Sequence, residues 1–433
     1  MTGQANPSPQ SLLVRVLSRA EHPISRSLLS ENALKVLYRL HRANFLAYLV
    51  GGAVRDLLLG RKPKDFDVGT NARPQQVRQL FRNSRIVGRR FPIARVQFPG
   101  EVVEVATFRR SPGVEEPNGE ETTDPLTPEL GREEDFGTPQ EDALRRDFTV
   151  NGLFYNIADF TVIDYVGGLE DLQRKVIRVI GTPSERFQED PVRMMRALEY
   201  AVRLGFSLDR ETEEAIYSCY REIRRVSPAR LAYELCESLR GGHASSIFRA
   251  FWRLGLLAEV CPFLLEYKEE ELERLFNLLH QADTLFGKLS FSEEALLALL
   301  VFPSLEPQLN AATTGGLSLG LLEAEIKSRV GAMAQLLAFS HYRSHLVRYG
   351  LMYFARLRQK PRSPKQALRF LRHEAFPVAL QLLAILAVAD PSAEQALSFW
   401  RGVQKRVEAG QPPLLQGGGR LWRRRRKARS PSP

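Results

Sequence analysis

The chain has 433 residues, 44% of them hydrophobic, three cysteines and a formal net charge of +11. This length allows two to four domains with a substantial core, and no run of 18 consecutive apolar residues indicates a membrane span. The first ten residues lack the pattern of a signal peptide. The cysteines are far apart, so we expect free thiols in a reducing, cytoplasmic compartment and no zinc site.

The N-terminal third combines helix and strand signals. Residues 1–25 show no regular pattern, and we expect a flexible N-terminus. After Ser30, apolar residues at helical spacing predict an amphipathic helix. Further helices are expected just after Gly52 and over 74–82, and strands over 45–50, 65–68, 85–87, 93–98 and 102–108. This pattern predicts an α+β catalytic domain over 26–168 with a mixed sheet of about five strands.

The remaining segments are distinguished by composition. Residues 108–143 are rich in Pro, Gly, Thr and acidic residues, which is typical of a mobile acidic loop. From Leu169 onward the spacing is helical almost throughout. We therefore expect an all-α region, divided into a domain over 169–265 and a C-terminal domain over 266–416. The tail 417–433 is expected to be disordered.

Two aspartates carry the sharpest chemical signal. Asp65 and Asp67 are two residues apart on an expected strand, so their side chains share one face. Neighbouring carboxylates repel unless a cation lies between them, and oxygen ligands suit Mg²⁺. A solvated pair on an edge strand has the same pattern, and the pair alone does not distinguish the two.

A glycine pair lies just before this strand. Gly51 and Gly52 follow a strand and precede a helix that carries Arg55, a geometry that lets backbone amides approach phosphates. Glu104 lies on the polar face of a later strand, where it could join the aspartates at a metal. An ordinary strand-to-helix turn and a solvent-facing glutamate remain open.

Two later motifs add charge. Arg145 and Arg146 can neutralise a triphosphate, and Asp147 can accept from a ribose hydroxyl or act as a third acid. Further on, the segment EDPVRMMR opens a helix, with Asp190 as the expected cap and Pro191 in its first turn. Asp190 and Arg193 share a helix face and could recognise the polar edge of a base; an ordinary cap with an ion pair is the alternative.

Four segments in order resemble one family. They are LVGGAVRDLLLGRKPKDFDVGT, EVATFRR, RRDFTVNGLFY and EDPVRMMRALEYAVRLGF, and together they look like the nucleotidyltransferase family of bacterial poly(A) polymerases and CCA-adding enzymes. The resemblance runs from about residue 20 to about 405 and is strongest over 48–206. It implies an all-α neck, body and C-terminal part, with a neck or RNA-binding domain over 169–265. It implies that two Mg²⁺ ions bind at Asp65 and Asp67 and that ATP is the substrate. It also implies nucleotide contacts by Arg145, Arg146, Asp147, Asn151, Glu189, Asp190, Arg193 and Arg196.

Within this family the chain is more similar to the poly(A) polymerase branch. The basic stretch IVGRRF, with Arg89 and Arg90, is the feature that weighs most. One departure is Arg95, where that branch usually has a histidine. The resemblance implies template-independent addition of adenosines to RNA 3′ ends; a CCA-adding tRNA nucleotidyltransferase and a non-catalytic RNA-binding protein are the alternatives.

The C-terminal tail is the most basic segment. It carries seven positive charges behind three glycines, so RNA phosphates are the expected partner, with accessory RNA-binding proteins as further candidates. A merely solubilising tail has the same composition. The residues expected to contact RNA there are Arg423, Arg424, Arg425, Arg426 and Lys427.

Overall fold

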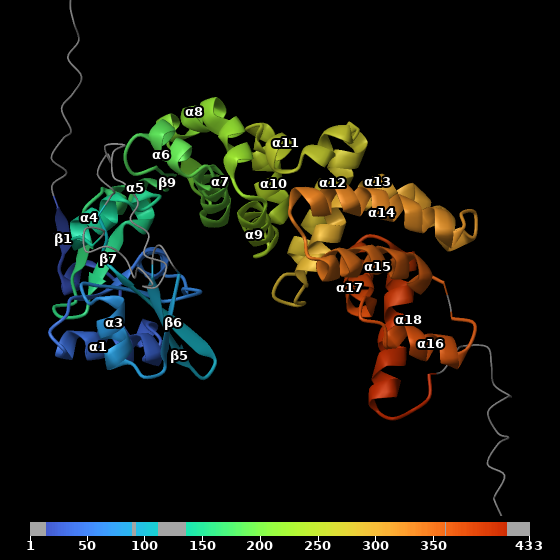
Figure 1. The fold of residues 1–433 in the computed structure, drawn as a ribbon, viewed down its shortest axis with the longest axis horizontal. Helices are drawn as coiled ribbons and strands as arrows, with labels where there is room; N and C mark the ends of the chain where they lie inside the picture. Colours follow the sequence, from blue (N-terminus) through green and yellow to red (C-terminus); the bar gives the residue numbers. More distant parts are fainter. Residues whose placement is uncertain (1–13, 89–91, 111–135, 360, 414–433) are drawn as a thin grey trace, which may run out of the picture. The chain divides into compact units, whose positions relative to one another are not determined.

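The computed structural model describes residues 14–88, 92–110, 136–359 and 361–413 (Figure 1). The chain divides into two compact units, Met1–Cys219 and Tyr220–Pro433. The division falls inside the segment 169–265 that was predicted as a neck domain. The domain boundaries predicted at residues 168 and 265 stay predictions.

An eight-stranded mixed sheet organises the first unit, in the order β1-β8-β7-β2-β3-β6-β5-β4. Strands β3 and β6 are parallel, and the other neighbouring strands are antiparallel. The mixed sheet is therefore confirmed, but its predicted size of about five strands is wrong. The strands are β1 (Arg15–Leu17), β2 (Ala47–Val50), β3 (Asp67–Thr70), β4 (Ser84–Val87), β5 (Ile93–Phe98), β6 (Glu101–Thr107), β7 (Leu153–Asn156) and β8 (Val162–Asp164).

Two segments predicted to be irregular are partly ordered. Strand β1 pairs with β8, and the His22 ring nitrogen Nε2 lies 2.8 Å from the carbonyl oxygen of Phe160. The flexible N-terminus predicted over 1–25 is thus wrong for residues 14–25, because strand partners 145 to 149 residues away hold them. The predicted loop 108–143 begins at the buried Phe108 and ends in helix α4 (Pro139–Leu144). Its centre, 111–135, lies outside the described residues.

Short helices surround this sheet. Ser30 caps α1 by accepting a hydrogen bond from the amide of Ala33, as the sequence predicted. The helices of the unit are α1 (Glu31–Arg42), α2 (Gly52–Leu58), α3 (Pro74–Leu80), α4, α5 (Gly168–Arg174), α6 (Pro183–Glu189), α7 (Val192–Leu204) and α8 (Arg210–Cys219). A short parallel pair, β9 (Val176–Ile177) and β10 (Ser207–Leu208), and the 3₁₀ turn η4 (Thr149–Asn151) complete it.

Close packing on β3 fixes the strand that carries Asp67. A Cβ atom added at Gly69 would lie 2.6 Å from Cε1 of the Phe108 ring, so only glycine lets this ring pack over the strand. Phe108 belongs to a buried cluster with Tyr48, Phe154 and others. The carboxylate end of β3 is therefore supported by a rigid aromatic core.

The second unit is helical, as predicted. Its helices are α9 (Pro228–Leu239), α10 (Ala244–Arg253), α11 (Leu256–Val260), α12 (Glu269–Thr284), α13 (Glu293–Thr314), α14 (Leu319–Leu336), α15 (His341–Leu357), α16 (Pro364–Leu371), α17 (Phe376–Leu386) and α18 (Pro391–Glu408), with 3₁₀ segments η5 (Tyr220–Arg225) and η6 (Pro262–Glu266).

Among the described residues, α13 is the one helix long and apolar enough to cross a membrane by length and composition. In this structure 67% of its apolar window is buried inside the protein. It packs against α12, α14, α15 and α17. A central helix of a globular unit has the same length and composition, and these neighbours indicate that role for α13. The absence of a membrane span stays a prediction, favoured by this packing.

Candidate active site

Three strands bring the predicted acidic residues to one place. In the antiparallel pair β2–β3, Asp67 lies opposite Val50, the residue directly before Gly51. In the parallel pair β3–β6, Val68 lies opposite Val105, so Glu104 lies beside Asp67. Strand alternation was also predicted correctly on β6, where Val103 and Val105 are buried. The sheet register thus gathers the glycine turn and two carboxylates.

Asp65 differs from its prediction. Strand β3 begins at Asp67, so Asp65 lies in the preceding loop rather than on a shared strand face. The strand cannot begin earlier because its partner β2 ends at Val50, where Gly51 turns away with a positive φ of 72°. Asp65 nevertheless remains close enough for its charge to act on Asp67.

The pKa of Asp67 reflects the carboxylates close to it. Partial burial and the neighbouring charge of Glu104 raise the pKa of Asp67 to about 6, with Asp65 adding to the effect and Arg146 opposing it. The Asp67 side chain still reaches solvent, so water screens part of the repulsion. A carboxylate whose ionisation is disfavoured by other carboxylates gains most from a bound cation.

The donor set matches a hard divalent cation. The described residues contain no group of three or more His, Cys, Asp or Glu side chains arranged to hold a metal ion. Asp65 and Asp67 offer two carboxylates, and Mg²⁺ is usually bound through one or two carboxylates together with substrate phosphates. The residues present therefore fit an ion that a nucleotide helps to hold.

Glu104 has a second neighbour. Arg95, directly opposite on β5, donates its Nε and Nη2 to Oε1 of Glu104 at 2.8 and 2.7 Å. Both side chains are partly exposed. Arg95, which replaces the histidine usual in the poly(A) polymerase branch, thus partly neutralises the charge of Glu104.

Arg146 lies against the glycine turn. A Cβ atom added at Gly51 would lie 3.0 Å from Nη1 of Arg146, so the turn needs glycine for space as well as for its positive φ. The guanidinium also donates to Oδ2 of Asp142 at 2.9 Å and lies over the Phe154 ring. Asp142, which the sequence did not single out, therefore orients a predicted nucleotide contact.

Arg55 has a different environment from the one predicted. Arg55 is only 7% exposed, and its Nε donates to Oδ1 of Asp56 at 2.9 Å. Its Nη1 donates to Oδ1 of Asn151 at 2.6 Å, and Nδ2 of Asn151 donates to Oδ1 of Asp147 at 3.1 Å. Arg55 also lies over the Tyr200 ring. The positive charge expected from Arg55 at the glycine turn is thus largely buried, and its chain of bonds orients Asn151 and Asp147; its nucleotide-binding role stays a prediction.

Arginines gather beside this network. Burial and the charge of Arg109 lower the pKa of Arg145 to about 10, with further lowering by Arg146 and Arg193. Burial and Arg193 also lower the pKa of Arg186. These guanidinium groups remain charged at neutral pH, and like charges at such proximity favour an anion between them.

Arg186 is a functional candidate that the sequence analysis missed. Its Nη2 donates to the backbone carbonyls of Arg145 and Arg146 at 2.6 and 2.8 Å, and its Nη1 donates to Glu189 at 2.7 Å. Arg193 reaches the same carboxylate at 3.0 Å. One side chain thus ties the Arg-Arg-Asp motif to the later acidic motif.

The later motif itself is arranged differently from its prediction. Asp190 is the C-cap of α6, and its amide donates to the carbonyl of Arg186, whereas Pro191 is the N-cap of α7. The short α6 ends there because its last turn meets the proline. The ion pair recorded for Arg193 is with Glu189. Asp190 and Arg196 make further contacts within the described residues.

The remaining predicted contacts cannot be placed. Arg89 and Arg90, and the tail residues Arg423, Arg424, Arg425, Arg426 and Lys427, lie outside the described residues. For the described site residues the structure supplies positions, and the roles assigned to them stay predictions.

Comparison with known proteins agrees with this geometry. Residues 47–178 match the family model described as the poly A polymerase head domain. Poly(A) polymerase I of Escherichia coli O157:H7 is 40% identical over 96% of this chain and 89% of its own length. The chain belongs to the bacterial poly(A) polymerase family. The Haemophilus influenzae enzyme is 34% identical over 89% of this chain and 86% of its own length.

Other relatives of this poly(A) polymerase family member are CCA-adding enzymes. The Bacillus velezensis CCA-adding enzyme is 36% identical over 64% of this chain and 65% of its own length. A crystal structure of the Bacillus stearothermophilus CCA-adding enzyme in complex with CTP has the same fold, with a TM-score of 0.63 at 24% identity over 87% of this chain and 82% of that one. The chain is therefore an RNA nucleotidyltransferase by family and fold.

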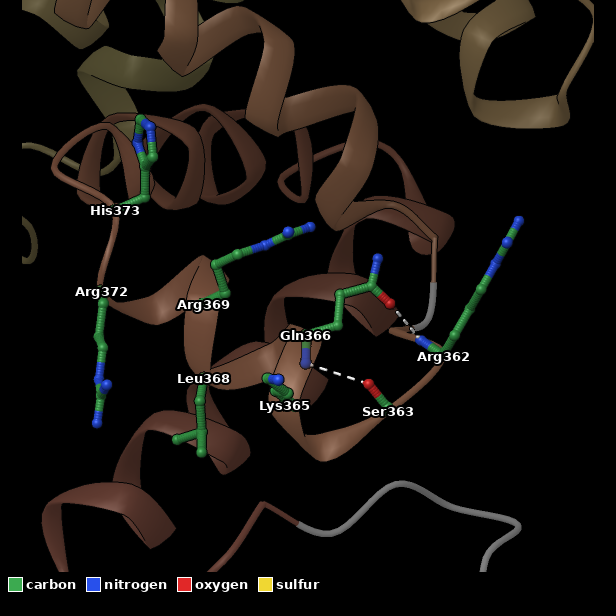
Figure 2. A pocket seen from close by; sticks show the side chains of 8 residues that line it. All are labelled: Arg362, Ser363, Lys365, Gln366, Leu368, Arg369, Arg372 and His373. Carbon is green, nitrogen blue, oxygen red and sulfur yellow. Dashed lines mark hydrogen bonds between the residues drawn. The ribbon is translucent and has the colours of Figure 1, made fainter.

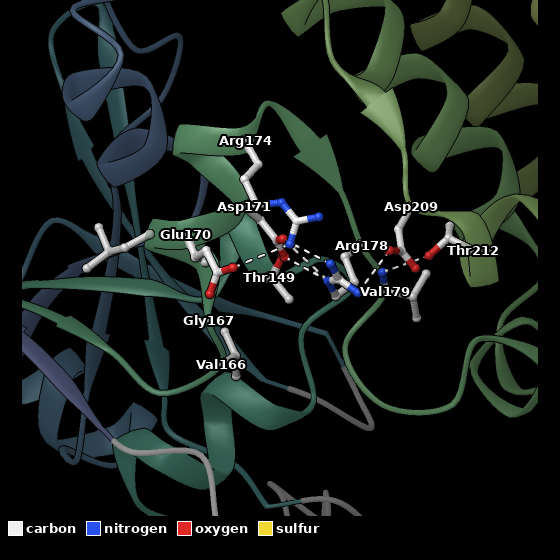
Figure 3. Close-up of polar contacts among 12 residues, drawn as sticks. Thr149, Val166, Gly167, Glu170, Asp171, Arg174, Arg178, Val179, Asp209 and Thr212 are labelled. Atoms are coloured by element: carbon white, nitrogen blue, oxygen red, sulfur yellow. Dashed lines mark hydrogen bonds and ion pairs between the residues drawn. The ribbon is translucent and has the colours of Figure 1, made fainter. Parts of the chain in front are cut away.

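A second family model, the probable RNA and SrmB-binding site of polymerase A, matches residues 205–268. A partly buried polar cluster joins its start to the head domain (Figure 3). Arg178 donates to Asp171 at 3.1 Å and pairs with Asp209 at 2.9 Å. Asp171 also accepts from the Thr149 hydroxyl at 2.7 Å. Thr149 begins the turn that carries Asn151, so the cluster connects both matched regions within the first unit.

Proposed function

We propose that this protein adds adenosines from ATP to RNA 3′ ends without a template. The observation that supports this most directly is the register of β2, β3 and β6. That register places the Gly51 turn, Asp67 and Glu104 together, with the Arg146 guanidinium beside the turn. Carboxylates for a cation and arginines for a polyphosphate are the two requirements of nucleotidyl transfer.

In this proposal Asp65 and Asp67 hold two Mg²⁺ ions, with Glu104 close by as a further acid. Bound Mg²⁺ would activate the RNA 3′-hydroxyl for in-line attack on the α-phosphate and stabilise the oxygens of the leaving pyrophosphate. Asp67, with its pKa near 6, is mostly ionised at neutral pH and ready to bind a cation. Arg145 and Arg146 take the negative charge of the triphosphate.

The same proposal assigns selection of the base to the later motif. Glu189 is held by Arg186 and Arg193, so its carboxylate has a fixed position. Asp190 and Arg193, together with Arg196, would then recognise the polar edge of adenine. Asp147, oriented by Asn151, would accept from the ribose. A fixed set of donors and acceptors replaces the template base.

CCA addition to tRNA is the second candidate function. The CCA-adding relative from Bacillus velezensis matches 64% of this chain, whereas the poly(A) polymerase relatives from Escherichia coli and Haemophilus influenzae match 89 to 96%. That difference favours polyadenylation. RNA 3′ ends are the proposed partner, the cytoplasm is the proposed location, and accessory RNA-binding proteins are further proposed partners.

The test is nucleotide addition by purified protein in Mg²⁺. A generic RNA and a tRNA lacking its 3′ end are each incubated with each of the four nucleoside triphosphates alone, and with CTP and ATP together. We expect long extension of the generic RNA with ATP alone. Addition of C, C and A to the trimmed tRNA alone would move the protein to the other branch. The Asp67→Ala variant, purified in parallel, controls for a contaminating polymerase. If the wild type adds no nucleotide, the alternative of a non-catalytic RNA-binding protein is favoured.

A further inference from the structure

A basic cavity lies in the second unit, on helix α16. It has a volume of about 800 Å³ and is open to solvent (Figure 2). Its lining includes Arg362, Lys365, Arg369 and Arg372, all exposed, and no acidic residue. None of these four takes part in a recorded ion pair with another described residue. Four uncompensated cations beside one cavity favour an anionic ligand.

Helix geometry explains why the cations lie together. Lys365, Arg369 and Arg372 are four and three residues apart, so they share one face of α16. The opposite face is buried through Ala367 and Phe370, whose ring contacts Tyr353 and Trp400. The packed face anchors the helix and leaves the basic face to solvent.

Local hydrogen bonds fix the start of the helix. The Ser363 hydroxyl accepts from the amide of Gln366 at 3.2 Å, and Oε1 of Gln366 accepts from the amide of Arg362 at 2.7 Å. These bonds hold Arg362 next to the first turn of α16, as Figure 2 shows. The cations therefore project from a defined backbone, which lowers the entropy cost of binding a ligand.

An aromatic ring lies at the end of this row. His373 lines the cavity, and its ring stacks on Tyr353 with centroids 4.2 Å apart. Burial and the nearby His345 lower the pKa of His373, so its ring is neutral at physiological pH. A neutral ring next to a row of cations combines the two groups that bind single-stranded nucleic acid, which are stacking surfaces and phosphate contacts.

The cations are distributed along the helix rather than gathered at one point. Lys365 and Arg372 are seven residues apart, which corresponds to about 10 Å along an α-helix. In Figure 2 the side chains of Arg362 and Arg372 lie at opposite ends of the group. This distribution suits successive phosphates of a strand better than one phosphate group.

We propose that this cavity binds a single-stranded segment of the RNA substrate, with the cations on its phosphates and His373 stacked on a base. The choice of RNA as the polyanion rests on the proposed function. The site is separate in sequence from residues 205–268, which match the RNA-binding family model. It would add an RNA contact on α16, C-terminal to the residues that match that model.

The first test measures RNA affinity by fluorescence anisotropy over a range of salt. The variant Arg362→Gln/Arg369→Gln/Arg372→Gln is compared with Lys327→Gln/Arg401→Gln/Lys405→Gln, which removes the same charge from exposed positions elsewhere in the unit. For a 20-nucleotide RNA at low salt, we expect the cavity variant to bind at least about tenfold more weakly. The slope of log K against log salt should fall by about 2, or 0.7 per lost contact.

The control variant should change affinity by less than about threefold. Wild-type affinity and salt slope in the cavity variant, or equal losses in both variants, would overturn the proposal.

A second test reports occupancy directly. Lysines are acylated with and without RNA and quantified by mass spectrometry; RNA should protect Lys365 but not Lys327. His373→Ala should weaken binding about fivefold, and His373→Phe should restore it, because stacking needs a ring but no proton. Equal acylation of Lys365 in both conditions would exclude the site. None of these binding measurements needs ATP. They can therefore support the RNA site even if the protein does not polymerise, and the protein can polymerise even if they exclude the RNA site.

Discussion

Replacing Arg186 with methionine should damage both the stability of the first unit and the use of ATP. The Arg186 side chain is only 12% exposed and donates to two backbone carbonyls and to Glu189. Hydrogen bonds from a charged donor contribute about 1.5 to 3 kcal/mol each, although the partly exposed bond to Glu189 contributes less. The burial that lowers the pKa of Arg186 offsets part of this sum.

We therefore expect the free energy of unfolding to fall by about 2 to 3 kcal/mol. For a unit of this size, that corresponds to a decrease in melting temperature of roughly 5 to 10 °C. The backbone of Arg145 and Arg146 would lose its anchor, and a small displacement of groups that bind the triphosphate can cost up to about a hundredfold in rate. We expect kcat/KM for ATP to fall about 10- to 100-fold.

Differential scanning calorimetry and steady-state kinetics check these values. Arg174→Met is the matched control, because Arg174 forms an exposed ion pair with Glu170 in the same unit. This variant should lose less than about 0.5 kcal/mol and keep its kinetics. The KM for RNA should stay constant in both variants, since Arg186 acts on the nucleotide motif. If Arg186→Met keeps kcat/KM for ATP within twofold of the wild type, the anchoring role is refuted.

Three further predictions concern the carboxylates and the tail. Asp65→Ala and Asp67→Ala should each lower turnover roughly a thousandfold without unfolding the protein, and near-normal rates in saturating Mg²⁺ would refute the metal assignment. In EDTA, Asp67→Asn should be more stable than the wild type at pH 8 by about 1 kcal/mol, after discounting for solvent screening. This gain in stability should shrink at pH 5. The raised pKa of Asp67, about 6 instead of 3.8, means that its ionised form destabilises the fold fully above pH 6 and not below pH 4. Thermal melts that show an equal gain at pH 8 and pH 5 would contradict this prediction. Removing residues 417–433 should raise the KM for RNA in a salt-dependent way and leave turnover at saturating RNA unchanged.

Strands with a local sequence signal, such as alternation or flanking glycines, were predicted from the sequence. Strand β6 alternates buried valines with polar residues, and β2 ends in two glycines, so both were expected close to their observed bounds. Strands β1, β7 and β8 were not predicted, although β7 is as long as the predicted β3 and β4, so length alone does not explain the omission. They form because partners distant in sequence pair with them, which no local pattern records.

The same distinction applies to the site. The spacing of Asp65 and Asp67 pointed to a cation. In the structure the charges of Glu104 and Asp65 both act on Asp67, although Asp65 lies outside the strand. Arg55 and Arg186 could not be assigned from spacing. The partner of Arg55 is Asn151, 96 residues away, and the partners of Arg186 are backbone carbonyls about 40 residues away. Contacts with a distant backbone have no residue type that signals them.

The partly buried cluster around Arg178 has a consequence for substrate binding. Arg178 connects Asp209, at the start of the region that matches the RNA-binding model, to Asp171 and through it to Thr149. Thr149 opens the turn that presents Asn151 to Arg55. RNA that shifts α8 would therefore change the affinity for ATP. By thermodynamic reciprocity, ATP would change the affinity for RNA by the same factor.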